Sequence, residues 1–107
     1  MEISKVARAL GALAQDTRLR NFRALVQRGP EGLPAGRIAE RLALPGPTLS
    51  FHLAQLQRAG LVRQRRQGRS RIYAADYASI RALVAYLSEN CCGAACTPGV
   101  RARAARG

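Results

Sequence analysis

The chain has 107 residues, with 18 basic and 6 acidic side chains and a formal net charge of +12. A chain of this length forms one domain with a thin core, and no apolar run approaches the roughly 20 residues that cross a bilayer. One histidine and six scattered acids provide no set of nucleophile, base and acid, which argues against an enzyme. The N-terminal segment does not resemble a secretory signal, so we expect a cytoplasmic protein without membrane contact.

Helical patterns fill the first part of the chain. Apolar residues at helical spacing predict a first helix with a stripe of Ile3, Val6, Leu10 and Leu13. Asp16 is expected to cap a second helix. The apolar side of that helix is formed by Leu19, Phe22, Leu25 and Val26. Residues 29–32 break the chain, a short helix is expected at 35–43 with Ile38, Ala39 and Leu42 facing inward, and residues 44–46 form a turn.

The next helix begins at Pro47, where a missing N–H costs nothing, and it ends before Gly60. Leu49, Leu53 and Leu56 fall on one side and should face the core. The opposite side and its flank carry Thr48, Ser50, Phe51, His52, Ala54, Gln55 and Arg58. Two helices joined by a short turn form a helix-turn-helix, whose second helix enters the DNA major groove. Phe51 either touches a thymine methyl there or packs on a neighbouring element, and His52 is expected to contact DNA.

A β-hairpin is predicted directly after this helix. Its strands are 61–66 and 71–74, and the tip at 67–70 contains a glycine where a positive φ is needed. Its arginines are Arg63, Arg65, Arg66, Arg69 and Arg71. Five arginines on one hairpin favour a wing that lies along phosphates or in the minor groove.

The last predicted helix is capped by Asp76 and has a broad apolar side of Tyr77, Ile80, Leu83, Val84 and Leu87. One small domain can hardly cover this side and the first helix together. We therefore expect a two-fold homodimer through the first and last helices, which places two recognition helices on a palindromic site. The expected interface comprises Ile3, Val6, Leu10, Ile80, Val84 and Leu87.

The predicted fold is mainly α with one β-hairpin, a winged helix-turn-helix. Residues 1–92 form the DNA-binding and dimerisation domain, and residues 93–107 form a flexible tail that contains cysteine and arginine. The expected DNA-binding residues are Thr48, Ser50, Phe51, His52, Gln55, Arg58, Arg65, Arg66, Arg69 and Arg71.

Four segments together resemble the ArsR/SmtB family of metal-responsive repressors, over about residues 3–90. They are Asp16-Thr17-Arg18-Leu19, Pro47-Thr48-x-Ser50-x-His52-Leu53, Ala59-Gly60-Leu61-Val62 and Gly68-Arg69-x-x-x-Tyr73. The resemblance implies a homodimer that represses its own operon and releases double-stranded DNA when an inducer binds. By position it implies that Thr48, Ser50, His52 and Gln55 read the groove and that residues 61–75 form the wing.

The cysteines depart from the best-known members of that family. Arsenical repressors keep a Cys-x-Cys cluster at the start of the recognition helix, whereas residues 44–51 contain no thiol. All three cysteines, Cys91, Cys92 and Cys96, lie near the C-terminal end, where they resemble the adjacent cysteines of other branches.

Trivalent arsenic or antimony favours three thiolates, and soft thiolates select soft ions. The sequence thus predicts an arsenic- or antimony-responsive repressor with Cys91, Cys92 and Cys96 as ligands and no organic cofactor. A thiol redox switch, a cadmium, lead or monovalent copper sensor, and an architectural protein that binds DNA without sequence preference remain alternatives.

Overall fold

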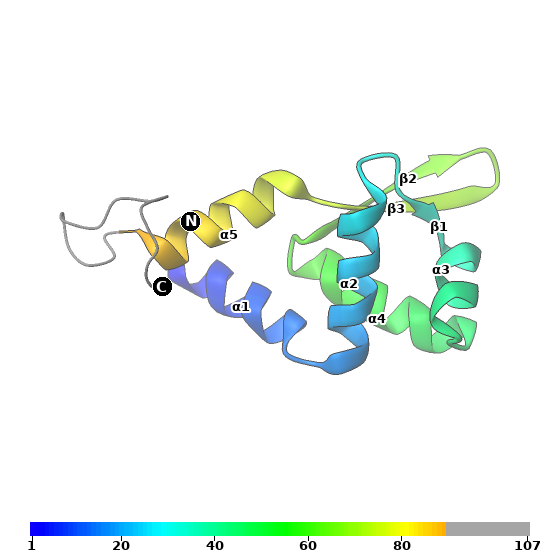
Figure 1. The fold of residues 1–107 in the computed structure, drawn as a ribbon, viewed down its shortest axis with the longest axis horizontal. Coiled ribbons are helices and arrows are strands. Elements are labelled where there is room, and N and C mark those ends of the chain that lie inside the picture. The colour runs from blue at the N-terminus through cyan, green and yellow to red at the C-terminus, as the bar shows by residue number, and fades with distance from the viewer. Residues whose placement is uncertain (90–107) are drawn as a thin grey trace.

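The computed structural model describes residues 1–89, which form five helices and a three-stranded antiparallel sheet (Figure 1). In chain order the elements are α1 Ile3–Leu13, α2 Asp16–Arg28, β1 Leu33–Pro34, α3 Ala35–Leu42, α4 Gly46–Arg58, β2 Val62–Gln67, β3 Ser70–Ala75 and α5 Tyr77–Ser88. The predicted class, mainly helical with a hairpin in a winged helix-turn-helix, is confirmed.

The core is centred on α4. Leu49, Leu53 and Leu56 are buried as predicted, because spacings of four and three residues bring them to one side of a helix. Leu25 of α2 and Ile38 of α3 are fully buried in the same cluster. These contacts fix the direction in which the opposite side of α4 faces.

The helix boundaries differ by one residue from the prediction at three places, one of which is the end of α3 at Leu42 in place of residue 43. The α2 cap is Gln15, whose side chain accepts a hydrogen bond from the Arg18 N–H, and Asp16 is the first residue of the helix. Helix α4 starts at Gly46, so Pro47 is its second residue. Asp76 caps α5 as predicted, and its carboxylate accepts a hydrogen bond of 3.1 Å from the Ser79 N–H.

The hairpin is confirmed with bounds that differ by one residue: β2 and β3 pair from Val62↔Ala75 to Gln67↔Ser70, so Gln67 and Ser70 belong to the strands and not to the tip. Gly68, in the two-residue loop, has a φ of 62°, a conformation that glycine adopts without steric cost. Strand β1 was not predicted. Its two residues pair with Tyr73 and Ile72 on the far side of β3, giving the order β1-β3-β2, and a strand this short has no alternating pattern to read.

Helices α1 and α5 extend to the same end of the molecule, away from α3 and the hairpin (Figure 1). Four of the six predicted interface residues are exposed here. They are Ile3 (71%), Leu10, Val84 (59%) and Leu87 (57%). Ile80 is half-buried, and Val6 is a correction, because it is buried with Ala9 and Ala12 in the core of the single chain. None of the helices within residues 1–89 has the length and hydropathy needed to span a membrane.

Candidate nucleic-acid interface

The outward side of α4 is the first component of the candidate site. Thr48, Ser50, Phe51 and Arg58 are exposed and Gln55 is half-buried, as expected for residues opposite the buried leucines. Hydroxyl, amide and guanidinium groups can all bond to base edges or phosphates. Phe51 keeps 56% of its surface exposed, so the structure brings the predicted groove-facing residues together on one side of the helix.

His52 is an exception among the predicted DNA contacts. Its side chain is 8% exposed, and its Nδ1 accepts a hydrogen bond of 3.3 Å from the Arg18 Nε–H. Its place on the flank of the leucine stripe turns the ring toward α2. The structure therefore assigns His52 to packing inside the domain and not to the outward set.

Burial and the neighbouring Arg18 guanidinium lower the pKa of His52 from its ordinary value of 6.5. Both causes disfavour the imidazolium, the first because a charge loses hydration and the second because like charges repel. The bond from Arg18 also needs an unprotonated Nδ1. His52 is thus held neutral, as an acceptor that orients Arg18.

Arg18 was missed by the sequence analysis as a site residue. Its guanidinium carbon lies 5.8 Å from the centre of the Phe51 ring, a cation–π contact. The Phe51 and His52 rings meet edge to face at a centroid distance of 5.6 Å. A single α2 side chain therefore steadies the aromatic pair on α4, and only the packing of α2 against α4 could reveal this.

The hairpin arginines divide between the two faces of the sheet. Every second residue of β2 points to the same face, so one face carries Val62, Gln64 and Arg66. On this face Val62 is buried, and the Gln64 amide donates a hydrogen bond of 3.1 Å to Gln57 Oε1 of α4. Arg66 is directly paired with Arg71 on this face. Like charges at opposed positions destabilise a sheet, so an anion between these two guanidiniums would remove the repulsion. The predicted wing contacts of Arg66 and Arg71 thus lie on the face that adjoins α4.

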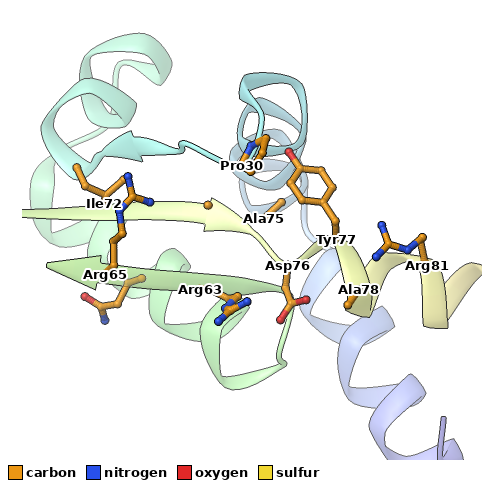
Figure 2. A pocket seen from close by; sticks show the side chains of 11 residues that line it. Pro30, Arg63, Arg65, Ile72, Ala75, Asp76, Tyr77, Ala78 and Arg81 are labelled. Carbon is orange, nitrogen blue, oxygen red and sulfur yellow. The ribbon is translucent and has the colours of Figure 1, made fainter. Parts of the chain in front are cut away.

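Arg63 and Arg65 point from the other face of the hairpin. Figure 2 shows them, with Arg81 of α5, around a pocket of about 450 Å³. The Arg65 Nη2 donates to the Glu31 carbonyl oxygen at 3.0 Å. The predicted DNA contacts Arg65, Arg66 and Arg71 therefore do not share one face, because a one-residue step along a strand reverses the face. Arg69, in the loop at the tip, is exposed.

The predicted thiol site, Cys91, Cys92 and Cys96, lies outside the described residues, as does the tail at 93–107. Within residues 1–89 no group of three or more histidine, cysteine or acidic side chains is gathered closely enough to hold a metal ion.

Comparison with known proteins agrees with this geometry. Residues 13–65 match the family model of a helix-turn-helix domain. The HTH-type transcriptional regulator KmtR of Mycobacterium tuberculosis (strain ATCC 25618 / H37Rv) is 32% identical over 83 residues, or 78% of this chain. The chain spans 62% of the length of that curated relative.

Two solved structures are similar over most of the chain. An ArsR-like transcriptional regulator from Rhodococcus sp. RHA1 has a TM-score of 0.73 at 28% identity, covering 80% of this chain and 78% of that one. The homodimeric winged helix-turn-helix DNA-binding domain of Mb0332 from Mycobacterium bovis, a possible ArsR-family regulator, has a TM-score of 0.65 at 32% identity, covering 82% of each chain.

The fold and the outward side of α4 define a winged helix-turn-helix protein. With the similarity to these relatives, the chain belongs to the ArsR family of transcriptional regulators.

Proposed function

We propose that this chain is a transcriptional repressor that binds a palindromic operator as a homodimer. Two observations carry the proposal: the polar side of α4 is exposed, and the Arg66–Arg71 pair lies on the hairpin face that Gln64 links to Gln57 of α4. Helix α4 can enter the major groove while the arginine pair meets an adjacent phosphate.

The exposed apolar residues of α1 and α5 support the homodimer. Ile3, Leu10, Val84 and Leu87 belong to the two helices that point away from the hairpin. A two-fold axis at this end buries the same surface on both copies and separates the two α4 helices. The homodimeric state of the Mb0332 domain is consistent with this arrangement.

We further propose that Cys91, Cys92 and Cys96 bind trivalent arsenic or antimony and that this binding releases the operator. Helix α5 ends at Ser88, and Cys91 is the third residue after it. A ligand that draws the three sulfurs together would act on the end of the helix that carries Val84 and Leu87. If the resulting change in dimer geometry weakened the binding free energy for the operator by about 1.4 kcal/mol, operator affinity would fall tenfold.

The first test concerns DNA. Duplexes selected from a random pool by the purified protein should yield a palindromic consensus, and fluorescence anisotropy should show tighter binding to it than to scrambled DNA of the same length. Selection without a consensus would favour the architectural alternative and would contradict the repressor.

The second test concerns the inducer. Arsenite should reduce operator affinity at least tenfold for the wild type, and the reduction should be lost in Cys91→Ser, Cys92→Ser and Cys96→Ser variants. Release by peroxide but not by arsenite would instead indicate a redox switch, and release by cadmium, lead or monovalent copper alone would indicate another soft-metal sensor. An unimpaired arsenite response in all three variants would exclude the cysteine site.

A further inference from the structure

A hollow of about 340 Å³ lies between α1, α2 and α4, beside the outward side of α4. Three arginines line it, each from a different helix: Arg8 from α1, Arg18 from α2 and Arg58 from α4. Gln55, one of the predicted groove-reading residues, lines it as well. The hollow is therefore continuous with the proposed DNA-binding surface.

The positive charge of this hollow is not balanced by acidic side chains in its lining. No aspartate or glutamate is among the lining residues. Three like charges on the arginines that line one small volume repel one another, and an anion bound there would attract all three. Arginine is also the residue best shaped to hold phosphate, because its planar donors can bond to two oxygens at once.

The hollow has one fixed guanidinium and two free to adjust. Arg18 donates from Nε to His52 Nδ1 at 3.3 Å and from Nη1 to the Ala12 carbonyl oxygen at 3.4 Å. Arg8 and Arg58 are exposed and can close on an incoming oxygen.

Gly11 leaves its part of the wall open. A Cβ atom added there would meet no heavy atom of another residue within 4 Å, apart from its chain neighbours and the backbone of its own helix. Space for a bulky anion such as a tetrahedral phosphate therefore exists beside the α1 backbone.

We propose that this hollow binds one backbone phosphate of the operator, so that α1 is part of the DNA interface. The inference rests on the proposed function, since it assumes that α4 faces duplex DNA. Helix α1 then has two roles. Arg8 holds DNA on one flank of the helix, whereas Ile3 and Leu10 lie roughly 140–160° away, at 100° per residue, on the surface proposed for dimerisation. A contact of this kind fixes the position of the protein on the duplex without reading its sequence.

The test measures how operator affinity depends on salt for Arg8→Ala, with Arg23→Ala as the matched control. Arg23 is an exposed arginine on α2 that lines a different pocket, between α2 and α3. One phosphate contact contributes about 0.9 to the slope of log affinity against log salt. We expect Arg8→Ala to lower that slope by about one and to weaken binding equally on operator and random duplexes, and Arg23→Ala to leave the slope unchanged.

A second variant tests the hollow from the opposite direction. Gly11→Asp places a carboxylate in it and should weaken binding more than Arg8→Ala does, with dimer mass and helix content unchanged by light scattering and circular dichroism. A wild-type salt slope in Arg8→Ala, or wild-type affinity in Gly11→Asp, would overturn the phosphate site. Neither result would change the preference of the wild-type protein for the operator over scrambled DNA, and that preference is the separate test of the proposed function.

Discussion

The two ends of this molecule meet their surroundings in opposite ways. Around α4 and the hairpin, the leucines face inward, and hydroxyl, amide and guanidinium groups face outward. On α1 and α5, Val6 and Leu83 are buried, yet Ile3, Val84 and Leu87 remain exposed. A surface rich in arginine suits a polyanion, whereas an exposed apolar surface on a small domain suits another protein surface. The difference supports the proposal that one end binds DNA and the other a second copy of the chain.

The largest expected effect comes from charging the apolar end. Val84→Glu with Leu87→Glu should give a monomer, because buried carboxylates would lose hydration at the two-fold axis. A monomer engages one half-site at a time, so operator affinity should fall about a hundredfold or more. Sedimentation velocity and anisotropy measure the two effects.

The matched control for that variant is Leu19→Glu. Leu19 is also exposed, but it lies on α2 outside the proposed interface. The Leu19→Glu variant should remain a dimer and keep the wild-type affinity for the operator. A dimer of wild-type mass in the doubly charged variant would contradict the assignment of this end to self-association.

A smaller effect should separate the two faces of the hairpin. Arg66→Ala with Arg71→Ala removes the pair that adjoins α4, and it should lower the slope of log affinity against log salt by about two. Arg63→Ala with Arg65→Ala removes the same charge from the opposite face and should leave the slope near its wild-type value. Equal losses in the two double variants would show that the faces are equivalent to DNA.

The smallest effect concerns the stability of the arginine-rich end. Since the folded-state pKa of His52 is lowered, the unfolded chain binds more protons as pH falls below about 6.5. The contribution of neutral His52 to the free energy of unfolding is therefore fully present above that pH and is lost as the pH falls through the folded-state pKa. Urea unfolding between pH 5 and 8 should show this decline in the wild type.

His52→Gln provides the control, because it lacks a titrating ring and its free energy of unfolding should vary less with pH over that range. His52 is the only histidine in the chain, so an NMR titration reports it without overlap. A pKa at or above 6.5 in the folded protein would contradict the neutral acceptor described for Arg18.

Helices and strands with periodic apolar patterns could be predicted from the sequence. Which of their side chains are buried and which are exposed could be predicted only in part. The leucines of α4 and the cap at Asp76 were predicted because helical spacing and a local hydrogen bond depend only on nearby residues. Strand β1 was not predicted, because it forms only by pairing with β3. The Gln15 cap was not predicted either, because the adjacent Asp16 is also a residue type that caps helices well.

The site residues whose positions in the fold differ from the expected ones share one cause. His52 lies at the edge of the buried side of α4, and its contact with Arg18 of α2 cannot be derived from the α4 pattern. Val6 was assigned to the dimer because its spacing matches Ile3 and Leu10, but at 100° per residue it lies roughly 40–60° round the helix from them, toward the buried Ala9. Arg65 and Arg66 are neighbours in sequence on opposite faces of a strand, and only the pairing register separates them.

The strand order β1-β3-β2 limits how this protein can associate with itself. The edge strands are β1, which has only two residues, and β2, which has six and is the longer open edge. That strand carries Arg63, Arg65 and Arg66, and charged side chains on an open edge prevent further strands from adding. Arg66, which we propose to meet a phosphate, therefore also acts with Arg63 and Arg65 against fibre-like stacking. With strand addition hindered in this way, the exposed apolar residues of α1 and α5 are the surface that we propose for self-association, and a two-fold contact there would be satisfied by a single partner.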